Sequence, residues 1–144
     1  MQRYVIDSSV FNKLFLDEVD RDKAQQLFIQ AAAGQVILLA PDLLYLEVIN
    51  TAQRCGVPLE GVVELLEAQK YLLQMRAVSD DERKKALQII AKGHTKSGYP
   101  SIYDALFHVM ALCNKAIFVT ADKRHYAKTE HLGSICLLSG LSFG

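Results

Sequence analysis

The sequence predicts an α/β fold with a central parallel sheet and helices on both of its faces. Two observations support this prediction: short apolar runs alternate with longer stretches of helical periodicity, and the short runs are almost continuously apolar. Strands that are buried on both faces of a parallel sheet show such unbroken apolar runs. Regular alternation of strands and helices is typical of a sheet whose parallel strands are connected by helices.

Five short runs are predicted as strands. Four of them consist mostly of Val, Ile, Leu and aromatic residues, and the remaining one is a more polar candidate between two helical stretches. In chain order the strands are expected at residues 4–6, 36–39, 75–78, 117–119 and 135–138.

The helical stretches between these strands have recognisable ends. Gly34 stops the first, and the second runs from the candidate N-cap Asp42 to Gly56. The fourth opens with acidic residues and ends before Gly93, where residues 93–100 are predicted as a Gly- and Pro-containing loop. The helices are expected at residues 21–33, 43–55, 59–73, 80–92 and 101–114.

The composition predicts a single globular domain over residues 1–144. The chain is 51% hydrophobic and 22% charged, which allows a substantial core. It has 16 basic and 16 acidic residues and no net charge, so it lacks the strongly basic character of many nucleic-acid-binding domains. This charge balance argues against nucleic-acid binding by overall charge, but it is compatible with a local basic rim around a metal site.

The N-terminus and the cysteines bear on the compartment. The chain opens with MQRYVIDSSV, which lacks the basic segment and long apolar run of a signal peptide, and no apolar stretch approaches the roughly 20 residues of a membrane-spanning helix. Cys55, Cys113 and Cys136 form no CxxC pair and lie in apolar stretches, so we expect buried thiols in a reducing compartment. These features predict a cytoplasmic protein without membrane contact.

Four acidic residues follow the predicted strands at points where they could meet. Asp7 directly follows the first strand, and Asp122 follows the strand at 117–119 after two residues. Glu47 lies among apolar residues one turn into the helix after the second strand, and Asp104 lies in the first turn of the helix at 101–114. Ligands of open parallel sheets bind at the carboxyl ends of the strands, so this edge is the expected site.

Each acid also has a structural explanation. Asp7 and Asp122 could cap short helices, and Asp104 forms the pattern of a capping box with Ser101. Glu47 could be a solvated helix residue, but its apolar neighbours favour a buried carboxylate that needs a cation or a hydrogen-bond donor.

The joint pattern favours a metal site. Carboxylates that converge raise one another's pKa values, and hard divalent cations relieve the repulsion. An all-oxygen set suits Mg²⁺ or Mn²⁺ better than Zn²⁺, which prefers Cys and His ligands. A site of this kind supports hydrolysis of a phosphate ester.

At these residues the chain resembles the PIN domain family, in particular its VapC-type toxin ribonucleases. Four motifs carry the resemblance in the right order and at comparable spacing, from residue 4 to residue 126: VIDSSV, PDLLYLEVIN, SIYDALFHVMA and FVTADKRHY. The resemblance implies a PIN-like three-layer fold with a five-stranded parallel sheet of order 3-2-1-4-5. It also implies a metal-dependent endoribonuclease that uses Mg²⁺ or Mn²⁺ and is the toxin of a type II toxin–antitoxin pair.

The resemblance assigns roles to individual residues. Asp7, Glu47 and Asp104 match the principal metal-binding and catalytic acids, and Asp122 matches a fourth, more variable acid. Thr120 and Ser9 match hydroxyl positions that support the site, although a turn residue and a helix start explain them equally well. Asn50 shares a helix face with Glu47 and is a further supporting candidate.

Basic residues near the acids are candidate contacts to RNA phosphates. Lys123, Arg124 and His125 follow Asp122, where some relatives have another acid, and a solvated charged turn is the alternative. Lys92, His94 and Lys96 form a second candidate group before the helix at 101–114. His108 could face the site, although a histidine at such a position is more often a satisfied core residue.

The resemblance also implies partners. In the toxins, helices corresponding to residues 8–33 and 59–73 form a homodimer and a groove for an antitoxin helix. Here the hypothesis rests on apolar side chains that core packing would also explain, namely Phe11, Leu14, Phe15, Leu27 and Phe28.

Other functions remain open at this point. They are a non-catalytic RNA- or protein-binding module on the same fold, a housekeeping RNA-processing nuclease, and a phosphohydrolase with an aspartyl nucleophile. Ser9 occupies the position where the last class places its second acid, and a phosphoacceptor receiver domain would need a pair of acids after the first strand.

Overall fold

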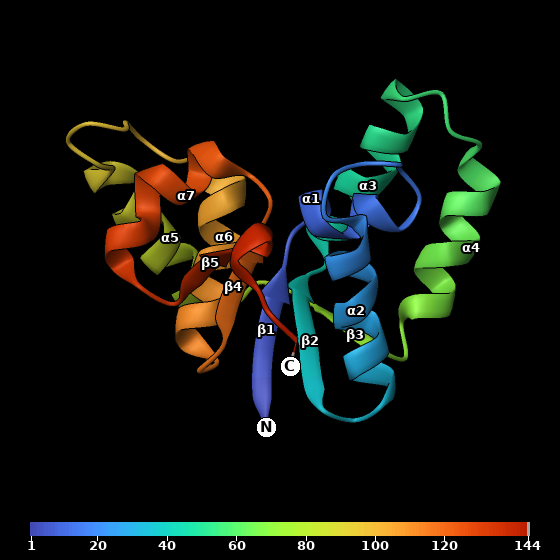
Figure 1. The fold of residues 1–144 in the computed structure, drawn as a ribbon. Coiled ribbons are helices and arrows are strands. Elements are labelled where there is room, and N and C mark those ends of the chain that lie inside the picture. Colours follow the sequence, from blue (N-terminus) through green and yellow to red (C-terminus); the bar gives the residue numbers. More distant parts are fainter. Residues whose placement is uncertain (144) are drawn as a thin grey trace.

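Five parallel strands form one sheet in the order β3-β2-β1-β4-β5 (Figure 1), as the computed structural model of residues 1–143 shows. This arrangement confirms the predicted order 3-2-1-4-5. The strands are β1 (Gln2–Ile6), β2 (Val36–Pro41), β3 (Leu73–Arg76), β4 (Ile117–Thr120) and β5 (Ile135–Leu137). The predicted single domain over residues 1–144 includes Gly144, which lies outside the described residues.

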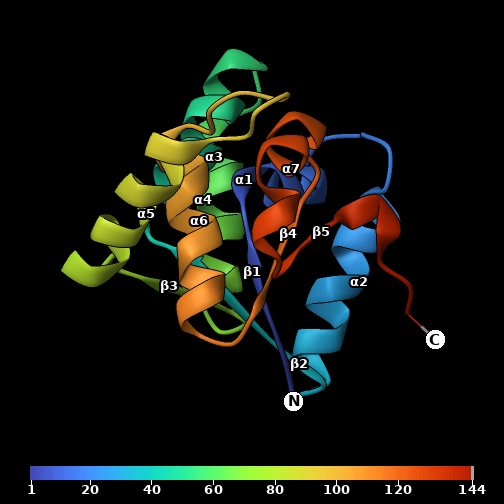
Figure 2. The ribbon, with the colours of Figure 1, turned by 90° about the vertical axis from the view of Figure 1, so that its left-hand side faces the viewer.

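Helices cover both faces of this sheet. They are α1 (Ser8–Phe11), α2 (Arg21–Ala32), α3 (Leu43–Arg54), α4 (Leu59–Gln69), α5 (Asp80–Lys92), α6 (Ile102–Cys113) and α7 (Lys123–Thr129). Helix α6 packs across β1, β2 and β4 with α5 outside it, and α2 packs on the opposite face against β2 (Figure 2). The predicted three-layer architecture is therefore confirmed.

The largest departure from the predicted boundaries lies between α4 and β3. The sequence predicts a helix at 59–73 and a strand at 75–78, whereas α4 ends at Gln69 and β3 begins at Leu73. The pair Leu72–Leu73 continues the apolar spacing of the helix and also suits a strand. Tertiary packing decides between them, because Leu73 pairs with Leu38 of β2 and is buried there.

The central strands carry the core and fix the register at the functional edge. Val5 and Ile6 of β1 are fully buried and pair with Phe118 and Val119 of β4. Since Ile6 lies opposite Val119, the next residues, Asp7 and Thr120, meet beyond the paired segment. The parallel pairing thus brings the ends of β1 and β4 together at one edge of the sheet.

The three cysteines differ in their exposure to solvent. Cys55 and Cys113 are exposed at the ends of α3 and α6, so the prediction of three buried thiols is wrong for them, and Cys136 is partly buried. Cys55 is the C-cap residue of α3 and Cys113 is the last residue of α6, so both lie at the end of a helix. Within residues 1–143 no helix is both long enough and apolar enough to span a bilayer.

Candidate active site

Asp7 lies at the centre of the carboxylate cluster and is held by three donors. It follows β1 as the N-cap of α1 and is 5% exposed. Its Oδ1 accepts hydrogen bonds from the Ser9 hydroxyl at 2.5 Å and from the Val10 N–H at 3.3 Å, and its Oδ2 accepts from the Thr120 hydroxyl at 2.6 Å. The carboxylate of Asp7 therefore caps α1 and also binds the hydroxyl of Thr120 at the end of β4.

Ser9 and Thr120 join the end of β1 to the end of β4. Ser9 Oγ accepts the Ala121 N–H at 2.9 Å, and Thr120 Oγ1 accepts the Asp122 N–H at 3.0 Å. Each hydroxyl therefore donates to Asp7 and accepts from the backbone after β4. This arrangement fixes both the orientation of Asp7 and the path of the chain toward Asp122.

Asp122 caps α7 and lies beside Asp104. Its Oδ1 accepts from the Arg124 N–H at 2.9 Å and from the His125 N–H at 3.2 Å, as expected for an N-cap residue. The pKa of Asp104 is raised mainly by burial, and the negative charge of Asp122 raises it further, so the two carboxylates repel each other.

Glu47 and Asp104 reach the cluster from two helices. Glu47 lies in the second turn of α3 and is partly buried. Asp104 lies in the first turn of α6, where its N–H donates to the hydroxyl of the N-cap Ser101 at 3.1 Å. Burial raises the pKa of Glu47, and the negative charges of Asp7 and Asp104 raise it further, so the three carboxylates interact electrostatically.

Burial and mutual repulsion make these acids unusually weak. Burial raises the pKa of Asp7 to about 6, although its hydrogen bonds from Ser9 and Thr120 oppose the shift. Burial, followed by the charges of Asp7 and Asp104, raises the pKa of Glu47 to about 7. The pKa of Asp104 is also raised, again mainly by burial. A cluster that resists ionisation in this way is a favourable environment for a cation.

The donor set fits a hard divalent cation. All four groups are carboxylates, the ligands that Mg²⁺ and Mn²⁺ prefer, and Cys and His take no part as donors. Among residues 1–143, no group of three or more His, Cys, Asp or Glu side chains is arranged so that it could hold a metal ion. The structure therefore shows acids that repel one another electrostatically and not a formed metal site.

His125 is a core residue, which corrects its predicted role at the RNA-contacting rim. It is 2% exposed, and its Nε2 lies 3.2 Å from the hydroxyl of Thr129. Its Nδ1 lies 3.7 Å from Oδ2 of Asp104, beyond hydrogen-bond distance. Burial lowers the pKa of His125 to about 4, so the ring is neutral near pH 7 and the contact is no ion pair. His125 occupies the inner face of α7, which the sequence could not distinguish from the outer face.

His108 also belongs to the core, as the structural alternative predicted. It is fully buried, and its Nε2 lies 2.7 Å from the carbonyl oxygen of Gly133. Its ring packs near that of His125, with 6.0 Å between the centroids.

The other candidate contacts lie on the surface. Lys123 and Arg124 are exposed on α7, and Lys96 is exposed in the loop before α6. Asn50 is exposed on α3, and it does not line the groove beside the acids, whereas its neighbour Thr51 does.

Sequence reasoning missed two cations in that groove. The groove has a volume of about 510 Å³, and Ser8, Ser9 and Asp122 line it together with Lys13 and Arg54. Arg54 lies seven residues after Glu47 and donates a hydrogen bond to Thr51 at 3.3 Å. The helical spacing of Glu47, Thr51 and Arg54 indicates that the three share one face of α3, and this pattern could have identified Arg54. For Lys13, which is buried beside Glu18, the sequence gives no comparable signal.

Solved structures share this fold at low sequence identity. VapC20 of Mycobacterium tuberculosis, a toxin that cleaves the sarcin-ricin loop, is 13% identical with a TM-score of 0.66, over 86% of this chain and 93% of that one. VapBC2 of Rickettsia felis, bound to DNA from its promoter, is 12% identical with a TM-score of 0.68, over 94% and 97%. A toxin–antitoxin complex of Klebsiella pneumoniae is 13% identical with a TM-score of 0.63, over 94% and 97%.

The family assignment rests on a sequence match. A search of curated proteins found no significant relative. The family model of the PIN domain, in contrast, matches residues 4–131, which include all four acids and every strand except β5. The chain therefore belongs to the PIN domain family.

Proposed function

We propose that this protein is a metal-dependent endoribonuclease whose active site is Asp7, Glu47, Asp104 and Asp122. The observation that carries the proposal is the convergence of these acids, three of which have raised pKa values. Burying several acids together lowers the stability of the fold, and strongly shifted pKa values of this kind are common at functional sites. Membership of the PIN domain family supports the same activity.

Each part of the site has a task in this proposal. Asp7, Glu47 and Asp104 would hold Mg²⁺ or Mn²⁺, and Asp122 would complete the set. When bound, the ion would supply Lewis acidity and neutralise charge that develops on the phosphate. Ser9 and Thr120 fix the orientation of Asp7, so that its carboxylate is ready for the ion before substrate arrives.

The groove beside the acids suits an RNA backbone. Lys13 is paired with Glu18, which also lines the groove, so Arg54 is the cation there that would contact a phosphate flanking the scissile bond. Lys123, Arg124 and Lys96 are exposed and could extend this contact. A local basic rim of this kind is compatible with the zero net charge of the chain.

We also propose that the nuclease is the toxin of a type II toxin–antitoxin pair and forms a homodimer. The toxin–antitoxin complexes with the same fold support this role. Phe11, Leu27 and Phe28, which motivated the partner groove, are core residues, so they cannot form it. Exposed Leu46 on α3, Ile29 on α2 and Leu59 on α4 are better candidates for a partner surface.

A housekeeping role in RNA processing is the main alternative for the same chemistry. A non-catalytic binding module on this fold would not need the strained acid cluster. Expression in a bacterial host separates toxin from housekeeping enzyme. A toxin would arrest growth, and Asp104→Asn would abolish the arrest.

Cleavage of a fluorescently quenched single-stranded RNA tests the activity itself. We expect hydrolysis that requires Mg²⁺ or Mn²⁺ and stops when EDTA is added. Asp7→Asn should lower kcat by a factor on the order of 10² or more, which is common for the loss of a principal electrostatic group. Asp81→Asn, an exposed acid on α5, is the matched control and should behave as wild type. Full activity of an Asp7→Asn, Asp104→Asn double variant would overturn the proposal.

A further inference from the structure

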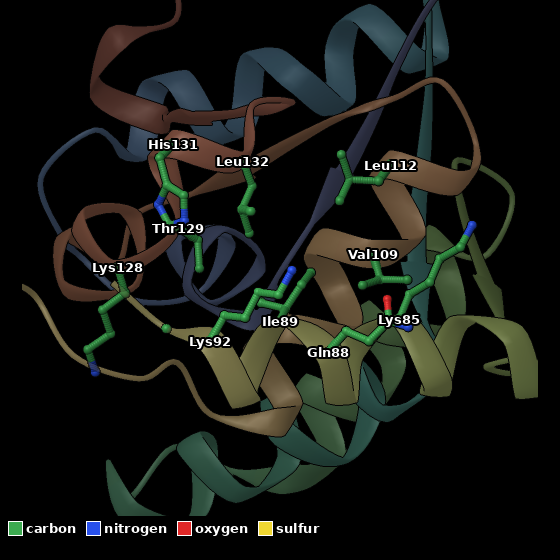
Figure 3. Close-up of a pocket in the computed structure, with 11 residues that line it drawn as sticks. Lys85, Gln88, Ile89, Lys92, Val109, Leu112, Lys128, Thr129, His131 and Leu132 are labelled. Carbon is green, nitrogen blue, oxygen red and sulfur yellow. The ribbon is translucent and has the colours of Figure 1, made fainter. Parts of the chain in front are cut away.

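A pocket with an apolar floor lies on the flank of the molecule between α5, α6 and the segment after α7 (Figure 3). Its volume is about 290 Å³, and Ile89, Val109, Leu112 and Leu132 form its apolar walls. Leu112 and Leu132 remain partly exposed to solvent. The volume lies near the lower end of the range for small-ligand pockets, about 300–1,000 Å³, so the pocket suits one compact planar group.

The rim of this pocket is positively charged. Lys92 of α5 and Lys128 of α7 lie at its mouth with His131, and none of the described lining residues is acidic. Figure 3 shows the Lys92 side chain over the pocket beside Ile89, with Lys128 pointing outward at the edge. In a chain with no net charge, this local excess favours a ligand that carries both negative charge and an apolar surface.

Aromatic rings continue the basic surface beyond the pocket. The imidazole of His131 lies 5.3 Å from that of His94, centroid to centroid. Tyr99 is 66% exposed and packs closely on Gly93, a lining residue of the pocket: a Cβ at Gly93 would lie 2.6 Å from the tyrosine ring. Exposed aromatic rings between basic residues are typical of surfaces that stack unpaired bases and hold phosphates.

Helix α7 connects this surface to the acids. Asp122 is the N-cap of α7, and Lys128 and Thr129 in the last turn of the same helix line the pocket. Tyr103, next to Asp104 in α6, is also exposed. An extended strand that leaves the acids along α7 would therefore pass Lys128 and reach the pocket.

We propose that this pocket is a subsite for one unpaired base of single-stranded RNA. The base would lie against Ile89, Leu112 and Leu132, and the adjoining phosphates would contact Lys92 and Lys128. This inference rests on the proposed ribonuclease function for the nature of the ligand. An acidic peptide could also contact the lysines, but the proposed cleavage site at the start of α7 and the exposed rings of Tyr99 and His131 favour RNA.

Binding of RNA, measured separately from cleavage, tests this subsite. The probe is a short single-stranded oligoribonucleotide with a 5′ fluorophore, and its anisotropy is followed with EDTA present so that cleavage does not occur. Lys92→Glu removes the positive rim, and Leu132→Trp fills the pocket without changing the charge. Lys84→Glu carries the same charge change on α5 at an exposed position outside the pocket and is the matched control.

We expect Lys92→Glu and Leu132→Trp each to weaken RNA binding roughly tenfold, as the loss of one stacked base commonly does, and Lys84→Glu to weaken it less than twofold. Ultraviolet crosslinking of a 4-thiouridine-containing oligonucleotide should label peptides from residues 85–92 and 128–132 in wild type. Unchanged affinity in both pocket variants, or crosslinks confined to other segments, would overturn the subsite.

The outcomes separate the subsite from the nuclease. If wild type cleaves RNA and both pocket variants do so with an unchanged KM, the proposed nuclease function is supported and the subsite is overturned. Binding at the pocket without cleavage by wild type supports the subsite and overturns the nuclease. Binding of an acidic peptide but not of RNA at this pocket would also overturn the subsite. If circular dichroism shows that the Leu132→Trp variant is unfolded, the affinity of Lys92→Glu and the crosslinks decide whether the subsite exists.

Discussion

The Thr120 hydroxyl donates a 2.6 Å hydrogen bond to Oδ2 of Asp7 and so ties the end of β4 to the end of β1. The same oxygen accepts the Asp122 N–H at 3.0 Å. One buried side chain therefore positions two of the four acids and supplies a donor to the most buried of them. This position also explains why a threonine, whose methyl group packs in the core while its hydroxyl faces the site, suits the last residue of the strand.

Replacing Thr120 should weaken the site through Asp7. Thr120→Val keeps the shape but loses both hydrogen bonds, and a hydrogen bond to a charged group contributes about 1.5–3 kcal/mol. We expect kcat to fall roughly tenfold or more in RNA cleavage assays and the midpoint of the Mg²⁺ dependence to rise. Thr120→Ser retains the hydroxyl and should stay close to wild type. Equal activity of the Val and Ser variants would show that the hydrogen bond to Asp7 has no role.

The charge on Asp7 should destabilise the metal-free fold as pH rises. Burial raises its pKa in the folded state from 3.8 to about 6. The folded state therefore retains a proton that the unfolded state releases, and this stabilising contribution is present below pH 3.8 and lost as pH rises through 6. Relative to wild type, Asp7→Asn should gain about 2–3 kcal/mol of unfolding free energy between pH 4 and pH 8, since each pKa unit corresponds to about 1.4 kcal/mol.

Urea denaturation in EDTA at the two pH values measures this change. The comparison across pH matters because an asparagine cannot accept both hydroxyl hydrogen bonds, which lowers the stability of the variant at every pH. A difference between variant and wild type that is the same at pH 4 and pH 8 would contradict the raised pKa. Saturating Mg²⁺ should remove the effect by stabilising wild type at pH 8.

The strands and the acids that follow them could be predicted from local sequence, whereas the strand order came from the resemblance to the PIN domain family. Near-continuous apolar runs mark buried strands, and Asp7 and Asp122 follow two of these runs directly. If these two strands are neighbours, as the family resemblance implied, parallel pairing places the two acids at one edge of the sheet. The placement of Glu47 and Asp104 followed from their positions near the start of helices and from the family motifs.

Orientation around a short helix could not be predicted in the same way. His125 turns inward because α7 packs on β5, and seven residues are too few for periodicity to reveal the buried face. Phe11 and Leu27 were ambiguous for a related reason: an apolar side chain in a helix predicts burial equally well against the core or against a partner. The pocket between α5 and α6 depends on the exact approach of three segments, which no local pattern encodes.

Metal binding should strengthen with pH across the range in which the acids ionise. The pKa of Asp7 is raised to about 6 and that of Glu47 to about 7, so a cation must displace protons at pH 6. We expect Mn²⁺ affinity to rise on the order of tenfold between pH 6 and pH 8, with proton release at pH 6. Isothermal titration calorimetry in buffers of different ionisation enthalpy measures both quantities. Equal Mn²⁺ affinity at pH 6 and pH 8 would contradict the raised pKa values of Asp7 and Glu47.

Buried His125 should destabilise the fold in acid. Burial lowers its pKa to about 4, so its stabilising contribution is present above 6.5 and is lost as pH falls through 4. The loss of stability that His125 causes in acid opposes the gain that Asp7 and Glu47 give in the same pH range. The unfolding free energy of wild type should therefore vary less with pH than either contribution alone. His125→Phe should be stabilised relative to wild type by roughly 2–3 kcal/mol on going from pH 7 to pH 4, as followed by urea denaturation. His131→Phe, at an exposed position, should show no such trend.

Arg54 offers a test of the groove beside the acids that leaves the carboxylates intact. It lines the groove with Lys13 at the end of α3, and its only recorded side-chain hydrogen bond among the described residues goes to Thr51. Arg54→Glu should raise KM for single-stranded RNA with little change in kcat, because the lost contact binds substrate and transition state alike. Loss of one phosphate contact should also lower the slope of log binding constant against log salt by about 0.7. Arg83→Glu, with the same charge change on the exposed face of α5, should leave KM and the salt slope at their wild-type values. An equal effect of the two arginine variants would mean that RNA responds to the overall charge of the protein and not to this groove.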